Sequence, residues 1–156
     1  QVRLMDQRTV EVIRKKLDYL ERTLAEIDPY LQTSYAQYAR QPAHRRATER
    51  LVQIIVEAIG DTSELLLQAA GQRAPGTMRE SLEGIRALGA IDDALCERFN
   101  RTYIGLRNRI VHDYDTLDNR ILFDSAKRLR KDTQAFLKSV VRYVASAHPK
   151  KQGARR

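Results

Sequence analysis

The apolar residues of this chain recur at steps of three and four over almost its whole length. This is the repeat of one face of an α-helix, and it constrains the fold more than any other feature. The first such stripe consists of Ile13, Leu17, Leu20, Leu24 and Ile27. No segment has the strict alternation of a half-buried strand, so we expect an all-α protein.

Interruptions of the repeat divide the chain into helices. Asp28 and Pro29 are expected to break or kink the first helix, whose stripe then continues over residues 31–41. A second long helix is expected over residues 43–70. Its apolar side chains cover more than one face, which predicts the most buried helix of the fold. Gly71 supplies a C-terminal stop.

Capping residues mark the remaining helices. Thr77 and Glu80 form a T-x-x-E capping box that opens a short helix, which Gly89 ends. Asp92 is expected to cap a fourth helix that runs to about Tyr114.

The fifth helix is expected to follow a cap at either Thr116 or Asp118 and to run to about Ala147. Together, these helices predict an up-and-down four-helix bundle with an additional short helix. Residues 1–147 are expected to form a single domain. Residues 148–156 are expected to form a basic, flexible tail.

The net charge is +8, and the basic excess lies near the C-terminus. From Asn119 onward there are eleven Lys or Arg and two Asp, whereas the preceding 118 residues carry seventeen basic and eighteen acidic side chains. RNA would be attracted to this end. A solvated helix face followed by a loose tail explains the same charges equally well. A plain nucleic-acid-binding bundle would use the exposed lysines of the last helix, namely Lys127, Lys131 and Lys138.

Composition argues against several classes of protein. Cys96 is the only cysteine, so no intramolecular disulfide can form, and we expect a cytoplasmic protein with Cys96 packed in the core. No apolar run approaches the roughly 18 residues of a membrane span, and no signal peptide is visible. The three His and one Cys lack the spacing of metal ligands, so we expect no metal site.

The run LRNRIVHDY, residues 106–114, carries the candidate site. On a helix, Asn108 and His112 are four residues apart and share a face. Arg107 and Tyr114 are seven residues apart and share the adjacent face. The four polar side chains would then line one ridge beside the apolar stripe.

These residue types suit the cleavage of RNA through attack by a ribose 2′-hydroxyl on the adjacent phosphate. His112 titrates near neutrality and can take up the proton. The guanidinium of Arg107 is always charged and stabilises the negative charge that builds up on the phosphoryl oxygens. Asn108 can orient the imidazole or donate to phosphate. The scheme requires no metal ion or cofactor.

Arg-x4-His alone is a weak signal in a chain with twenty-one arginines. A second, looser match from Arg142 to His148 lacks both the polar neighbour and the following tyrosine. A surface helix end, where His112 favours the C-terminal dipole, explains the same residues without any chemistry.

The wider context of the motif resembles the HEPN superfamily and, within it, the HepT toxins of HepT/MntA toxin–antitoxin systems. The shared features are Arg107, Asn108, His112 and Tyr114, together with the upstream stretch PGTMRESLEGIRALGAIDDAL. The resemblance is close over residues 71–143 and rests on helical pattern elsewhere.

The resemblance implies a homodimeric, metal-independent ribonuclease toxin whose two motifs face one cleft. It also implies a nucleotidyltransferase antitoxin that adds AMP to Tyr114, where the anionic nucleotide would fill the cleft and repel RNA from Arg107. Packing of a helix-end aromatic ring on a neighbour is the alternative for Tyr114. The alternative function is a non-catalytic scaffold that binds a nucleotide or the transferase.

Other charged residues allow a functional and a structural interpretation. Asp113, Asp115 and Asp118 could bind a metal or a basic partner, but turn formation and capping explain them with fewer assumptions. The candidate contacts to RNA phosphate are Arg45, Arg46, Arg50 and Arg109.

Overall fold

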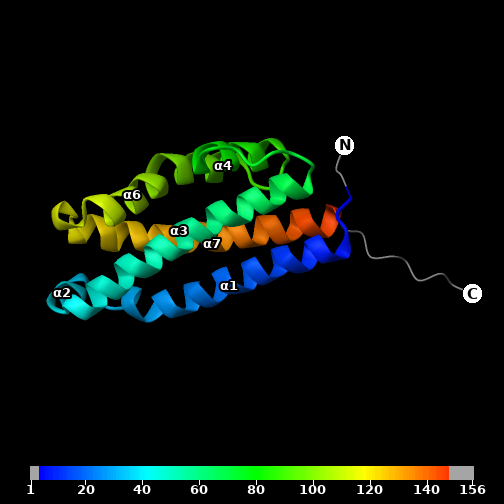
Figure 1. Ribbon diagram of the computed structural model, residues 1–156. Coiled ribbons are helices and arrows are strands. Elements are labelled where there is room, and N and C mark those ends of the chain that lie inside the picture. The colour runs from blue at the N-terminus through cyan, green and yellow to red at the C-terminus, as the bar shows by residue number, and fades with distance from the viewer. Residues whose placement is uncertain (1–3, 148–156) are drawn as a thin grey trace, which may run out of the picture.

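A computed structural model describes residues 4–147, which form a bundle of long helices (Figure 1). The long helices are α1 (Gln7–Leu31), α3 (Pro42–Ala69) and α7 (Asn119–Ala147). The fourth long helix of the bundle is interrupted. It consists of α5 (Asp93–Arg98), a π-helical turn η1 (Phe99–Tyr103) and α6 (Ile104–His112). The short elements are α2 (Tyr35–Arg40), α4 (Met78–Ala87) and the 3-10 turn η2 (Tyr114–Thr116).

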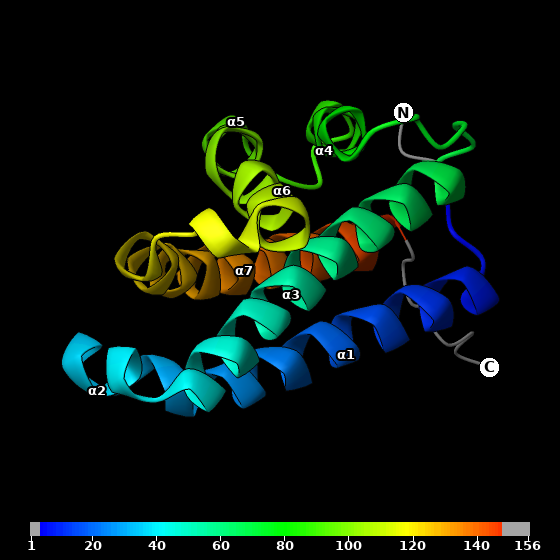
Figure 2. The same ribbon diagram turned by 60° about the vertical axis from the view of Figure 1, so that its left-hand side comes forward.

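The expected all-α fold is confirmed, and no strand occurs within residues 4–147. Figure 2 shows α4, α5 and α6 on one side of α3 and α7, with α1 on the other side. The small helix α2 is an addition to the expected set. The tail expected at residues 148–156 lies outside the described residues.

Of the break or kink expected at Asp28 and Pro29, the break is wrong, because α1 continues through the proline to Leu31. Pro29 removes one backbone hydrogen bond and crowds the carbonyl four residues earlier, at a cost of about 3 kcal/mol. Ile27 and Leu31, on either side of it, are buried, so packing against the core keeps the last turn helical. The gap falls instead at residues 32–34, where the Ser34 hydroxyl caps α2.

Helix α3 is the centre of the bundle, as its apolar residues predict. It begins with Pro42 in its first turn and contacts α1, α2, α4, α6 and α7. At its end, Gly71 adopts a left-handed φ of +82°. The next N–H, from Gln72, then donates to the Leu67 carbonyl at 2.9 Å. This is the Gly-dependent helix stop that the sequence indicates.

The other predicted caps are also present. The Thr77 hydroxyl accepts the Glu80 N–H at 3.2 Å, and Gly89 ends the following segment with a φ of +83°. Asp118 rather than Thr116 caps α7, because its Oδ1 accepts the Ile121 N–H at 3.0 Å.

The helix that carries the motif contains a π-helical turn that the sequence analysis did not predict. The Ile104 N–H donates to the carbonyl of Phe99, five residues earlier. The carbonyl of Asn100 in this turn accepts from Arg79 of α4 at 2.9 Å. Phe99 and Tyr103 of this turn are buried in the core, together with Leu106 further along the helix.

The motif helix ends at His112 and not at Tyr114. Asp113 leaves the helical conformation, with φ −131° and ψ 35°. Its carbonyl accepts both the N–H and the hydroxyl of Thr116, at 3.1 and 3.0 Å. These local hydrogen bonds replace those of a further helical turn. The seven-residue spacing from Arg107 therefore does not place Tyr114 on the same helix face.

Two further expectations about single side chains are confirmed. Cys96 is buried, and burial raises the pKa of its thiol, so it packs in the core as expected. The exposed residues of α7 include Lys127, Lys131, Lys138 and Arg142. None of the helices within residues 4–147 is both long and apolar enough to cross a lipid bilayer.

Candidate active site

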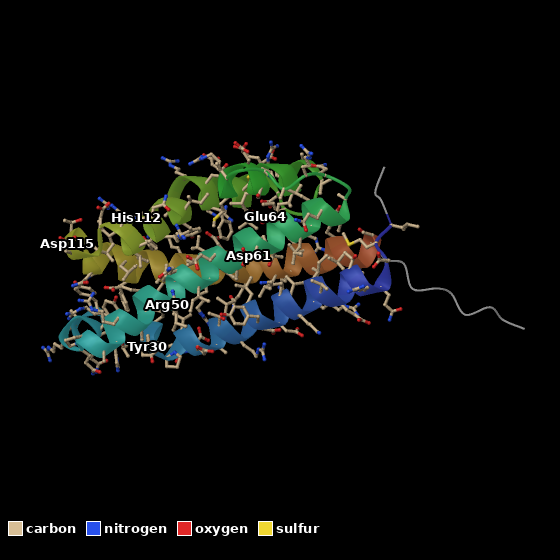
Figure 3. The ribbon with its side chains drawn as sticks, viewed as in Figure 1. Tyr30, Arg50, Asp61, Glu64, His112 and Asp115 are labelled. Atoms are coloured by element: carbon tan, nitrogen blue, oxygen red, sulfur yellow. The ribbon has the colours of Figure 1, made fainter. Side chains whose placement is uncertain are left out.

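Arg107, Asn108 and His112 lie on the last turns of α6, where this helix packs beside α3. The side chain of Arg107 is 29% exposed, whereas Asn108 and His112 are exposed to solvent. Figure 3 shows His112 in the half of the bundle that contains α2, together with Arg50 of α3. Among the described side chains, none forms a hydrogen bond with the imidazole of His112. Its exposure makes the ring accessible to a ligand.

Arg107 is held in place by an acidic residue of α3. Its Nη2 and Nε both donate to Oε1 of Glu57, at 2.8 and 3.2 Å. On its other side, Nη1 donates to Oδ1 of Asn108 at 3.3 Å. Asn108 thus contacts the guanidinium and not the imidazole.

Glu57 is kept ionised by its neighbours. Partial burial acts to raise the pKa of its carboxyl group, but hydrogen bonds from Arg107 and Gln53 act in the opposite direction, as do the charges of Arg107 and Arg50. The balance lowers the pKa of Glu57 below its ordinary value. At neutral pH the Arg107–Glu57 contact is therefore a charge-assisted pair.

A hollow of about 440 Å³ lies between α3 and α6, and one of its lining residues is Gln53, the donor to Glu57. It is lined by Arg46, Glu49, Arg50, Gln53 and Ile110. The two arginines bring positive charge close to the motif, as a site for phosphate requires. Arg46 also donates to Glu49 at 3.2 Å, which offsets part of that charge.

The remaining candidate residues lie elsewhere. Arg45 does not line the hollow, since its guanidinium donates to the carbonyl of Ala39 at the end of α2. Arg109 is exposed on α6. The backbone of Tyr114 begins the 3-10 turn that follows the motif helix. No three His, Cys, Asp or Glu side chains among the described residues are placed to share a metal ion.

Glu57 and Gln53 are site residues that the sequence analysis missed. With Arg46 and Arg50, they occur at helical steps of four, three and four along α3. They form a polar stripe along a helix that is otherwise rich in apolar residues. This stripe is the signal that could have identified them.

Comparisons with known proteins place this chain in a family. The family model described as "Ribonuclease HepT-like" matches residues 6–140. Cytosolic protein of unknown function YutE from Bacillus subtilis has a similar structure, with a TM-score of 0.75 and 21% identity over 92% of this chain and 94% of that chain. A toxin–antitoxin structure with AMP-PNP gives a TM-score of 0.74 and 19% identity over 83% of this chain and 97% of that chain.

Identities this low show a shared fold alone. The sequence has no significant match among curated proteins. The family model, however, spans most of the chain, and residues 107–114 lie within the matched range. The chain therefore belongs to the HepT-like ribonuclease family of the HEPN superfamily.

Proposed function

We propose that this protein is the RNA-cleaving toxin subunit of a toxin–antitoxin pair. The observation that carries the proposal is that the last turns of α6 carry both Arg107 and His112, and that a hollow between α3 and α6 is lined by Arg46 and Arg50. Membership of the HepT-like ribonuclease family supports RNA as the substrate. The similar fold found in a toxin–antitoxin structure supports a role in a toxin–antitoxin pair.

In the proposed reaction, His112 takes the proton from a ribose 2′-hydroxyl as this oxygen attacks the adjacent phosphorus. The O2′–P bond forms and the P–O5′ bond breaks. The imidazolium returns its proton to the leaving 5′-oxygen. Arg107 stabilises the charge on the phosphoryl oxygens of the phosphorane. The products are a 2′,3′-cyclic phosphate and a 5′-hydroxyl, and the reaction uses no metal ion.

We propose that flanking phosphates contact Arg46, Arg50 and Arg109. Arg45 was a further candidate, but its contact with the Ala39 carbonyl favours a structural role. In a homodimer, two copies of the motif would face one cleft. The single, buried Cys96 supports action in the cytoplasm.

Regulation is the second part of the proposal. A nucleotidyltransferase antitoxin would add AMP to the hydroxyl of Tyr114, two residues beyond His112. The added phosphate and nucleoside would occupy the approach to the motif and repel RNA. Intact-mass measurement with and without the partner tests this step. Mass increments of AMP that disappear in Tyr114→Phe are expected, and an unchanged mass beside an active transferase would refute it.

Cleavage itself is tested with the full chain and a single-stranded RNA in EDTA. We expect a 2′,3′-cyclic phosphate product, and loss of cleavage in Arg107→Ala and His112→Ala with unchanged helicity. Undiminished cleavage by His112→Ala would rule out the mechanism. The alternative, a scaffold that only binds a nucleotide or the transferase, predicts no cleavage and a complex that survives His112→Ala.

A further inference from the structure

The guanidinium of Arg107 has little donor capacity left for a substrate. An arginine side chain has five N–H donors. The contacts with Glu57 use Nε–H and one Nη2–H, and the contact with Asn108 uses one Nη1–H. The two remaining donors are one on each terminal nitrogen. A phosphate must therefore approach through Nη1 and Nη2, because the Nε edge faces α3.

Glu57 is itself held in a fixed place. Gln53, one turn earlier on α3, donates from Nε2 to Glu57 Oε1 at 3.1 Å. The same oxygen accepts both bonds from Arg107, so a single atom sets the orientation of the guanidinium. The contacts between Arg107 and Glu57 join α6 to α3, although the two residues lie fifty positions apart in the sequence.

We propose that Glu57 is a positioning residue of the ribonuclease site: it fixes the Nε edge of Arg107 against α3, so that Nη1 and Nη2 face the scissile phosphate. The inference rests on the proposed ribonuclease function and extends it to a residue outside the motif. Glu57 acts through Arg107 and does not itself touch the substrate.

An ordinary ion pair between helices is the competing interpretation. Such a pair would affect the stability of the fold and leave turnover unchanged in the folded enzyme. A positioning residue acts on turnover, because a small misplacement of a catalytic group has a large effect on rate. Glu57 also places a negative charge near the phosphate, so its removal is expected to strengthen RNA binding. Turnover and KM should therefore fall together.

The experiment measures kcat and KM of the full chain with a single-stranded RNA oligonucleotide. In Glu57→Ala we expect kcat to fall by about 10- to 100-fold, with a KM no higher than that of the wild type. In Glu57→Gln, the amide oxygen can accept the same N–H groups, so kcat should stay within about threefold of the wild type. Glu64→Ala is the matched control, because Glu64 lies two turns further along α3 (Figure 3) and should leave both constants unchanged.

Several results would overturn the inference. Wild-type kcat in Glu57→Ala, with Arg107→Ala inactive, would refute positioning and leave the proposed function intact. Equal losses of kcat in Glu57→Ala and Glu57→Gln, with normal helicity, would also refute it, because the amide keeps the acceptor. Activity in both Arg107→Ala and His112→Ala would instead reject the proposed function itself.

A second comparison decides the matter if Glu57→Ala does not fold. Glu57→Asp keeps the charge but withdraws the carboxylate by one methylene group. Positioning predicts a kcat that is lower in Glu57→Asp than in Glu57→Gln. The reverse order would show that the charge matters and the place of the oxygen does not, which would overturn the inference.

Discussion

Tyr103, in the π-helical turn of the motif helix, donates its hydroxyl hydrogen to Oδ2 of the buried Asp132 on α7. The other carboxylate oxygen of Asp132 accepts from Arg98 Nε at 3.1 Å. This network ties the helix that carries the motif to the last helix of the bundle. A buried carboxylate is tolerated here because both of its oxygens have a donor.

Replacing Tyr103 by Phe should lower the free energy of unfolding by about 1–3 kcal/mol, because Asp132 loses one of its two donors without gaining another. Urea denaturation followed by circular dichroism measures the change. Tyr30→Phe is a suitable control, since no described residue forms a hydrogen bond with its hydroxyl. Equal stability of the Tyr103→Phe protein and the wild type would contradict the role given to this network.

The same contact predicts a dependence of stability on alkaline pH. Burial raises the pKa of Tyr103, and the hydrogen bond to Asp132 and its charge raise it further. Below the ordinary tyrosine pKa of about 10, both folded and unfolded states keep the proton. Above it, only the unfolded state ionises, so stability should fall by up to about 1.4 kcal/mol per pH unit for this residue.

Denaturation of wild type and Tyr103→Phe between pH 9 and pH 11, a range chosen to span the tyrosine pKa of about 10, tests this expectation. The loss of stability should be shallower in the variant. It should not vanish, because burial also raises the pKa of Tyr38 and Tyr143. Parallel curves for the two proteins would show that Tyr103 ionises equally in both states.

The hollow beside the motif predicts a separate effect on RNA binding. Arg46→Gln and Arg50→Gln should each raise KM for RNA with little change in kcat, because their charges would contact flanking phosphates. Each should also reduce the slope of log affinity against log salt by about 0.7, the value for one phosphate contact on a single strand. Arg22→Gln on α1 serves as the control. Unchanged salt slopes would remove these arginines from the substrate path.

Two helical glycines predict opposite changes in stability. Gly105 in α6 has open space where a Cβ would lie, so Gly105→Ala should raise the free energy of unfolding by about 0.5–1 kcal/mol. A Cβ at Gly84 in α4 would meet Leu67 Cδ2 at 2.8 Å. Leu67 is almost fully buried, so Gly84→Ala should be destabilising. Thermal unfolding of both variants gives the test, and equal shifts would contradict the packing of α4 on α3.

Features that depend only on residues adjacent in the sequence could be predicted from the sequence. The stops at Gly71 and Gly89 and the cap at Thr77 need only a few residues of context, and all three are present. Pro29 was misjudged because buried side chains on either side keep α1 helical, which is an effect of packing. The end of the motif helix was misplaced by two residues because Asp113 and Thr116 form local hydrogen bonds instead.

The candidate site was predictable only in part, because some of its contacts join residues that are distant in the sequence. Arg107, Asn108 and His112 are close in sequence and therefore could be grouped on one helix. Glu57 lies on another helix, and its contact with Arg107 depends on how α3 and α6 pack. Periodicity within one helix carries no information about such a pair.

The π-helical turn at Phe99–Tyr103 is equivalent to a single-residue insertion in an otherwise regular helix. Deleting one residue within it would produce a longer uninterrupted α-helix and would improve its backbone hydrogen bonding. That deletion would leave the downstream helix faces nearly where they are, because the bulge takes up its extra residue locally. Deleting one residue in the regular turns of α6 before Arg107 would instead rotate Arg107 by about 100° around the helix axis and away from α3, so the chain tolerates a shorter helix only at the π-turn.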